Sequence, residues 1–474
     1  MSHSHDRVEN PYEAPRMLHD ASATPGGDAP TRVRYIVMAF LGVLAFLTYF
    51  DRICITRAAA VISKDLSLTD VQMGWIMGAF WFAYAVFELP AGRMGDRHGA
   101  RITLSRIVLA WSVFTALSGC SIGFVSLLMY RFLFGVGEAG AFPNMARIQS
   151  RWLPVAKRPV FGGLLWMLAR WGGAFSIPFF GLMMRTFDSE TFDNLVAGIP
   201  LVNQLSGVAA WRLSFMAAGM IGLVWIAAFY WWFRDHPSEK STVNEAELKL
   251  ITHGAPPEVR GHAMEPGMWT RLLTNRSLLS LGVLYLCGSF GWSFFASWMP
   301  KYFKDVQKMP YEESEWMSAA PLFFGGITCL LGGFLCNWMV KLTGSQRWGR
   351  AVLPVGGYIT AAIAMFCIPF VRSPTEAIVL MCIAEAAHDL GQGSNWASIM
   401  DIGGKYAGVA AGLINTIGNM GNAFQPAIGA MIRERYGWNA MFVVYSVAFL
   451  IAASMWLWID PRRTFYENGD RAAE

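Results

Sequence analysis

The chain has 474 residues, of which 54% are hydrophobic and only 15% are charged, and its formal net charge is +5. Because soluble proteins carry about 25% charged residues, this composition excludes an ordinary soluble domain and indicates a protein that lies mostly in lipid. The small net charge gives no reason to expect a nucleic-acid partner. All seven cysteines lie in or at the ends of apolar stretches without metal-ligand spacing, so we expect neither a metal site nor a disulfide framework.

Residues 1–32 are polar, and we expect them to form a disordered cytoplasmic tail without a cleavable signal peptide. Apolar segments follow, each of about the 20 residues that a membrane-spanning helix needs. The twelve predicted spans are 33–57, 70–91, 102–120, 122–143, 158–184, 211–232, 277–303, 316–339, 350–371, 374–399, 405–432 and 438–459. The sequence therefore predicts an all-α membrane protein with twelve transmembrane helices.

The positions of the basic residues predict the orientation of these spans. Arg93, Arg97 and Arg101 follow the second span, and more arginines and lysines follow the fourth and eighth, whereas the opposite loops are acidic or mixed. Since positively charged loops stay in the cytoplasm, we expect both termini there. The predicted organisation is a six-helix bundle at 33–232, a central cytoplasmic loop at 233–275, a second six-helix bundle at 276–460 and a cytoplasmic tail at 461–474.

The two halves of the chain repeat one another. Four residues of the fifth span recur in the eleventh at one constant offset: Gly173, Pro178, Gly181 and Met183 correspond to Gly421, Pro426, Gly429 and Met431. Parallel repeats of six spans are a recurring plan of secondary transporters, in which the substrate lies near the midplane where the halves meet.

The fourth span carries two ionisable residues in an otherwise apolar run. Arg131 and Glu138 are seven residues apart, so they share one face of a helix and lie about 10 Å apart along its axis. Charged groups at this depth nearly always face a bundle interior or a water-filled cavity, which indicates a functional site. The alternative is an internal ion pair that only locks two helices together.

The loop after the second span reads Gly92-Arg93-Met94-Gly95-Asp96-Arg97-His98-Gly99-Ala100-Arg101. It resembles the signature loop of the major facilitator superfamily, in which glycines allow a tight cytoplasmic turn. Asp96 can accept hydrogen bonds from a neighbouring helix N-terminus, and the arginines can hold the loop at the inner face. The resemblance implies a gating loop formed by Gly92, Asp96, Arg97, Gly99 and Arg101.

Four further segments resemble the anion:cation symporter family of that superfamily, which includes hexuronate, galactonate and glucarate transporters and phthalate permeases. These segments are Tyr49-Phe50-Asp51-Arg52, Arg131 to Glu138 with Phe142-Pro143, Trp298 to Tyr302, and Asn415 to Asn419. The resemblance extends over about residues 35–460.

This resemblance implies roles for individual residues. Asp51 and Glu138 match the acids that carry the coupled protons, and Arg52 and Arg131 match the cations that bind the substrate carboxylate. An arginine suits a carboxylate because its planar fork offers parallel donors and stays charged. Further substrate contacts are implied for Tyr49, Tyr84, Trp292, Trp396, Asn415 and Asn419. The only cofactors expected are protons, as coupling ions.

We expect Glu138 to pair with an arginine when no substrate is bound. An anion that takes the arginine would raise the affinity of Glu138 for a proton, which would link anion entry to proton entry. Counting residues from the span ends places Arg131 near the midplane, Glu138 in the cytoplasmic half and Asp51 in the outer half. Asp51 would then exchange protons outward and Glu138 inward. The alternative for Asp51-Arg52 is an interfacial pair at a helix end.

Two features depart from the sugar-acid members of the family. The fifth span carries Ala169-Arg170 where an amide side chain is expected, and Arg170 could contact substrate or pair with an acid such as Glu88. The tenth span holds a polar group consisting of Glu385, His388, Asp389 and Gln392. Polar packing at the rim of the cavity is the favoured interpretation, and a metal site or a second proton path are the alternatives.

The sequence thus predicts a secondary transporter, not an enzyme, that imports a small organic anion with protons across the cytoplasmic membrane by alternating access. The expected substrate is a sugar acid, such as hexuronate, galactonate or glucarate, or an aromatic carboxylate. A monomer surrounded by the lipid bilayer is the expected state. Sodium-coupled or exchange transport remains open, as does a membrane sensor that binds a carboxylate without moving it.

Overall fold

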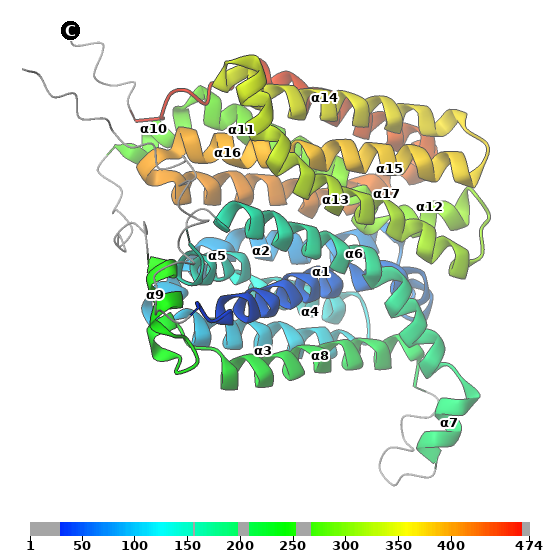
Figure 1. The fold of residues 1–474 in the computed structure, drawn as a ribbon. Helices are drawn as coiled ribbons and strands as arrows, with labels where there is room; N and C mark the ends of the chain where they lie inside the picture. Colours follow the sequence, from blue (N-terminus) through cyan, green and yellow to red (C-terminus); the bar gives the residue numbers. More distant parts are fainter. Residues whose placement is uncertain (1–28, 155–156, 198–207, 253–266, 467–474) are drawn as a thin grey trace, which may run out of the picture.

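The computed structural model describes residues 29–154, 157–197, 208–252 and 267–466. Within these ranges every regular element is a helix (Figure 1). Most of the two predicted tails, and part of the predicted central loop, lie outside the described residues.

The first half of the chain forms long helices joined by short turns. These helices are α1 (Val33–Asp65), α2 (Asp70–His98), α3 (Ala100–Ser118), α4 (Phe124–Glu138), α5 (Ala141–Trp152), α6 (Arg158–Phe187), α7 (Glu190–Ala197) and α8 (Ala210–Trp232). The short α9 (Glu245–Thr252) follows, where Glu245 and Lys249 pair across one turn over 2.7 Å, as expected for charges four residues apart.

The second half has the same character. Its helices are α10 (Met268–Thr274), α11 (Arg276–Ser297), α12 (Met299–Asp305), α13 (Tyr311–Thr343), α14 (Gln346–Cys367), α15 (Pro374–Leu390), α16 (Gln392–Gly403) and α17 (Ala407–Ser454). The last of these contains a sharp break at Gly437, where φ is 80° and ψ is 176°.

Each predicted span coincides with helix, but several ends differ. The ranges 122–143, 277–303 and 374–399 are each divided into two helices, at Gly140, Trp298 and Gly391. Gly140 has a φ of 87°, a conformation that glycine adopts without steric cost. Helix α1 runs to Asp65 rather than ending at residue 57, so Asp51 and Arg52 lie inside a continuous helix and are not an interfacial pair.

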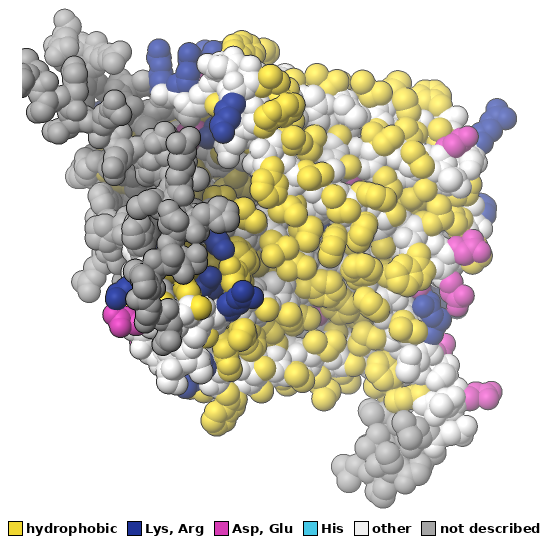
Figure 2. All heavy atoms as spheres, in the orientation of Figure 1, with side chains coloured by type: hydrophobic (Ala, Val, Ile, Leu, Met, Phe, Trp, Pro, Cys, Tyr) yellow, Lys and Arg dark blue, Asp and Glu magenta, His cyan; other side chains and the backbone are white. Residues whose placement is uncertain are grey.

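Nine helical segments among the described residues are long and apolar enough to cross a membrane. One of them, Ala407–Leu457, has 51 residues and could cross twice, since a crossing takes about 20 residues. Figure 2 shows hydrophobic side chains in a broad band across the visible face, with charged side chains gathered towards its two ends. This distribution is the one expected of an all-α membrane protein, whose lipid-facing surface must be apolar.

The helices lie in two groups, α1 to α8 and α10 to α17, and both ends of the described chain lie at the same end of the molecule (Figure 1). Helix α6 packs on α1, and α17 packs on α11 in the corresponding way, which agrees with the repeat of the fifth span in the eleventh. The two groups meet where α2 packs on α17 and α6 packs on α13.

Close contact between α2 and α17 depends on glycine. A Cβ atom on Gly78 would lie 2.0 Å from the carbonyl oxygen of Ala423, and one on Gly74 would lie 2.6 Å from that of Pro426. Small residues let helix backbones approach closely in a membrane, where packing replaces the hydrophobic effect as the source of association.

Candidate functional site

Arg52 and Glu138 form a buried ion pair between α1 and α4. Nε of Arg52 donates to Oε1 of Glu138 over 2.6 Å, and the two side chains are 3% and 0% exposed. Glu138 is the last residue of α4, because the chain turns at Ala139 and Gly140. A carboxylate at a helix C-terminus faces the negative end of the helix dipole, so it depends on a nearby cation such as Arg52.

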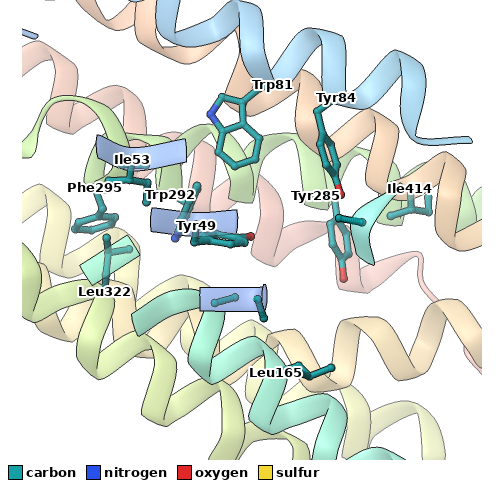
Figure 3. Close-up of a cluster of buried hydrophobic side chains, with 14 of the residues drawn as sticks. Tyr49, Ile53, Trp81, Tyr84, Leu165, Tyr285, Trp292, Phe295, Leu322 and Ile414 are labelled. Carbon is teal, nitrogen blue, oxygen red and sulfur yellow. The ribbon is translucent and has the colours of Figure 1, made fainter. Parts of the chain in front are cut away.

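Aromatic rings surround the Arg52 guanidinium. Its central carbon lies 4.6 to 5.7 Å from the ring centres of Tyr49, Phe80, Trp81, Tyr84 and Phe142. Figure 3 shows Tyr49, Trp81 and Tyr84 together with Trp292 of α11 in one cluster of buried side chains. Aromatic faces attract a cation most strongly where water is excluded, so these rings stabilise the charge of Arg52 in its buried position.

Arg131 contacts the backbone of α1 instead of Glu138. Its Nη2 donates to the carbonyl oxygen of Arg52 over 3.1 Å, and its Nη1 lies 3.5 Å from that of Asp51. Its guanidinium carbon also lies 4.6 Å from the ring centre of Phe134. Arg131 and Glu138 therefore do not form the internal ion pair considered from the sequence, because Glu138 binds Arg52.

Both arginines border the same small cavity. The cavity has a volume of about 10 Å³, and its lining includes Arg52, Thr56 and Arg131 from the first group of helices and Ala296 and Ser297 from α11. This volume is about that of a single water molecule. The two predicted substrate cations thus converge on one point, which the second group of helices covers.

Asp51 lies one residue before Arg52, the residue that binds Glu138. Helix α1 has 33 residues, which corresponds to about 50 Å, so Asp51 lies near its middle rather than towards its outer end. Asp51 is buried, at 3% exposure, and it precedes Arg52, which contacts Glu138. That Asp51 and Glu138 exchange protons with opposite sides of the membrane stays a prediction.

A second buried ion pair links the two groups of helices. Nε and Nη2 of Arg170 on α6 donate to Oδ2 and Oδ1 of Asp389 on α15, over 2.7 and 2.8 Å. Arg170 therefore does not pair with Glu88, the partner considered from the sequence. Two glycines of α13 make room for this pair. A Cβ atom on Gly325 would lie 2.8 Å from Oδ2 of Asp389, and one on Gly326 would lie 3.1 Å from Cβ of Arg170.

The polar group of the tenth predicted span surrounds this pair. Nδ1 of His388 lies 3.1 Å from Oδ1 of Asp389, and its Nε2 lies 3.2 Å from the amide nitrogen of Gln392. Trp292 donates from its indole nitrogen to Oε1 of Glu385 over 2.7 Å. Glu385, His388 and Asp389 lie close enough together to hold a metal ion. However, Arg170 neutralises Asp389, which favours the polar-packing interpretation.

The remaining predicted substrate contacts divide into two sets. Asn415 of α17 donates to Oε2 of Glu88 on α2 over 2.5 Å, and the Tyr84 hydroxyl donates to its Oε1 over 3.3 Å. Asn419 accepts a hydrogen bond from Asn422 on its own helix over 3.4 Å. Trp396 contacts Tyr285, whose ring centre is 6.4 Å away. Tyr49, Tyr84 and Trp292 thus lie at the arginine cluster, and the structure shows no contact of Trp396 or Asn419 with Arg52.

The predicted gating loop is described only in part. The backbone of Gly92, Asp96 and Arg97 continues α2, and the side chains of these residues lie outside the described part. Gly99 has a φ of 80°, as expected for a tight turn, and Arg101 donates to the carbonyl oxygen of Tyr230 over 2.9 Å. Asp235 accepts from the backbone nitrogens of Ala100 and Arg101 and so caps α3.

Ion pairs join the two groups of helices at the end away from the described termini. Glu315 of α13 binds Arg57 of α1 and, over 2.9 Å, Arg185 of α6. Asp70 of α2 binds Arg433 of α17 and, over 3.2 Å, Lys301 of α12. These contacts hold this end of the molecule closed.

We did not predict Glu88, Asp235 or Glu315 as site residues from the sequence. For Glu88 a signal was present, because an ionisable residue within an apolar span is the same feature that singled out Glu138. Asp235 and Glu315 lie near span ends, where charged residues are common and carry no such signal.

Comparison with known proteins supplies the family. The family model of the Major Facilitator Superfamily matches residues 41–426. A probable sulfoacetate transporter, SauU of Cupriavidus necator, is 30% identical over 451 residues, which cover 94% of this chain and 97% of that protein. A probable galactarate/D-glucarate transporter, GudP of Bacillus subtilis, is 27% identical over 89% of this chain and 90% of its own length. The hexuronate transporter of Bacillus subtilis is 26% identical over 88% and 91%.

Solved structures agree on the fold. A bacterial homologue of the human lysosomal transporter Spinster, in an inward-facing and occupied conformation, superimposes with a TM-score of 0.71 over 90% of this chain and 97% of that chain, at 21% identity. The xylose transporter XylE of E. coli gives a TM-score of 0.66 over 91% and 98%, at 14% identity. These proteins are transporters, not enzymes, and the chain belongs to the Major Facilitator Superfamily, within its anion transporters.

Proposed function

We propose that this protein imports a small organic anion together with protons across the cytoplasmic membrane, by alternating access between the two groups of helices. The observation that carries the proposal is the Arg52–Glu138 pair, in which a carboxylate of the protein binds a guanidinium surrounded by aromatic rings. The relatives named for sulfoacetate, galactarate/D-glucarate and hexuronate support an organic anion as the substrate.

The proposed coupling follows from competition for Arg52. A substrate carboxylate and Glu138 both need the same guanidinium, and an uncompensated buried charge is costly. Protonation of Glu138 removes its charge and frees Arg52 for the substrate. Conversely, a substrate bound to Arg52 leaves Glu138 without its cation and favours its protonation. Binding of the anion and of the proton therefore reinforce one another.

Arg131 and Asp51 complete the proposed site. Arg131 borders the cavity beside Arg52 and provides a second cation for the same carboxylate. Asp51 is buried on α1 next to Arg52, its backbone carbonyl oxygen lies 3.5 Å from Nη1 of Arg131, and it is the second candidate proton carrier. Tyr49, Tyr84 and Trp292 line the cluster, where their rings can contact the carbon skeleton of the substrate.

The proposed orientation places the described termini in the cytoplasm, as the basic loops indicate. The end closed by Glu315 and Asp70 is then the outer end. We propose that one monomer, made of a six-helix bundle from each half, carries out the whole cycle.

Uptake into proteoliposomes tests this function. Purified protein is reconstituted, and entry of labelled D-glucarate or sulfoacetate is followed with an inward proton gradient, with an inward sodium gradient at equal pH, and with neither. The proposal predicts that the labelled anion accumulates with the proton gradient and does not accumulate under the other two conditions. Accumulation that follows sodium would contradict proton coupling. Exchange without accumulation would indicate an exchanger, and binding without any exchange would indicate a sensor.

A further inference from the structure

The structure contains two guanidinium sites of the same design. Arg52 binds the carboxylate of Glu138 against the ring of Tyr84, and Arg170 binds the carboxylate of Asp389 against the ring of Trp292, with 4.6 Å from guanidinium carbon to ring centre in each case. Both arginines belong to the first group of helices and both are less than a tenth exposed. The role proposed above uses Arg52 and leaves Arg170 without a function.

The ring of Tyr49 lies beside both arginines. The guanidinium carbons of Arg52 and Arg170 lie 4.7 and 5.8 Å from the centre of the Tyr49 ring, so they are no farther apart than the sum of these distances. Allowing about 2.8 Å for each charge-assisted hydrogen bond, a short carbon chain with an acid group at each end can reach both arginines. The rings of Tyr49 and Trp292, 6.4 Å apart, would flank that chain.

We infer that the substrate carries two acidic groups, and that Arg170 binds the second of them while Arg52 binds the first. This inference rests on the proposed function, because it assigns a substrate class to the same site. The fork of Arg170 already donates two hydrogen bonds to one carboxylate, which is the geometry that an acid group of a ligand would use.

Asp389 has an alternative partner when the substrate takes Arg170. His388 lies 3.1 Å from Oδ1 of Asp389 and is itself held by Gln392, so a released Asp389 carboxylate keeps a hydrogen bond in a buried position. Buried polar groups need such partners, since an unsatisfied one destabilises the protein. The exchange of partners at Arg170 therefore resembles the exchange of partners at Arg52.

Displacement of Asp389 would also affect the contact between the two groups of helices. Arg170 lies on α6 and Asp389 on α15, so their ion pair bridges the groups. A ligand with two acid groups would replace this bridge with contacts of its own, whereas a ligand with one acid group would leave it intact. Because the Arg170–Asp389 pair bridges the two groups of helices, we expect the protein to distinguish ligands with two acid groups from ligands with one.

Paired ligands test the inference. Binding to the purified full-length protein is measured by calorimetry for D-glucarate against D-gluconate and for sulfoacetate against acetate, so that each pair compares two acid groups with one. The wild type is expected to bind the two-acid member of at least one pair at least tenfold more tightly. The double variant Arg170→Gln/Asp389→Asn removes both partners together, so that neither is left as a buried charge without the other. It is expected to lose most of that preference while it keeps its affinity for the one-acid member.

Two further variants serve as controls. Arg106→Gln removes an exposed arginine of α3 and is expected to bind as the wild type does. Arg170→Lys keeps the charge without the fork and is expected to retain only part of the preference.

The possible failures are distinguishable. Equal affinity for the two members of each pair, or an undiminished preference in the double variant, would overturn the inference and leave the proposed function standing. If the wild type bound no member of either pair, the proposed function would itself be contradicted.

Discussion

Nε of Arg52 lies 2.6 Å from Oε1 of Glu138, so the cation proposed to bind the substrate and the acid proposed to carry the proton are bound to each other. The two residues come from different helices, α1 and α4, and neither has appreciable contact with solvent. In this arrangement an acid group that takes the Nε–H of Arg52 displaces Glu138, and the proposed coupling rests on that exchange.

Replacement of Arg52 tests its role as the substrate anchor. Arg52→Gln removes one partner of a buried, hydrogen-bonded charge pair with the substrate, a change that costs about 2–5 kcal/mol. Since about 1.4 kcal/mol corresponds to a factor of ten, substrate affinity should fall by roughly thirtyfold or more. Calorimetric titration of the purified variant measures this loss. Arg106→Gln on α3 is the matched control. If the Arg52→Gln variant bound substrate with an affinity within a factor of about three of the wild type, the assignment of Arg52 as the anchor would be refuted.

Closure of the outer end should depend on Glu315. Glu315→Gln removes the charge that binds Arg57 and Arg185. Breaking a buried pair such as Arg57–Glu315 costs about 3–5 kcal/mol, and the loss of the pair with Arg185, which is 37% exposed, adds less. The outer end should therefore open more often, and a Ser297→Cys thiol beside the cavity should react faster with an impermeant maleimide added outside. All variants in this experiment also carry Cys120→Ser, because Cys120 is an exposed thiol that would itself react with the maleimide.

The neighbouring Glu312 provides the control for this experiment. Its side chain is 76% exposed and lies 4.0 Å from Arg185, so Glu312→Gln should leave the reaction rate of the thiol almost unchanged. Equal rates for the Glu315 and Glu312 variants would show that the Glu315 contacts do not hold this end closed.

Contact between α2 and α17 should be sensitive to a single methyl group. In Gly78→Ala the new Cβ atom would lie 2.0 Å from the carbonyl oxygen of Ala423, so the helices must separate. Such overpacking costs about 1–3 kcal/mol, and we expect a lower melting temperature together with faster labelling of the Ser297→Cys thiol. Gly356→Ala on α14 is the control, because no neighbouring atom would lie within 4 Å of its added methyl group. Identical behaviour of the two variants would contradict a tight contact at Gly78.

Much of the fold could be predicted from the sequence because membrane spans leave a strong local signal. Each predicted range coincides with helix, and the repeat of the fifth span in the eleventh corresponds to the packing of α6 on α1 and of α17 on α11. The helix breaks at Gly140 and Gly391 were not predicted, because a glycine within an apolar run equally allows close packing. The end of α1 was placed too early because Arg57 and Lys64 give its last turns the composition of a loop.

The pairing of the charged residues could not be predicted in the same way. Arg52 and Arg131, and likewise Asp51 and Glu138, are chemically equivalent choices, and only the packing of α4 against α1 decides that Glu138 binds Arg52. Arg170 and Asp389 are far apart in the chain, and their contact depends on two glycines of α13, the helix that packs on both α6 and α15. One sequence reveals which residues are unusual at membrane depth, but their partners are a property of the folded protein.

Replacement of Glu138 tests the central claim most directly. Glu138→Gln removes the proton carrier, keeps the size of the side chain and leaves Arg52 free for substrate. In proteoliposomes this variant should fail to accumulate labelled substrate against its gradient when an inward proton gradient is applied, yet it should still exchange labelled for unlabelled substrate. Glu245→Gln on the short helix α9 is the control and should accumulate substrate as the wild type does. Proton-driven accumulation by Glu138→Gln at the rate of the wild type would contradict the account.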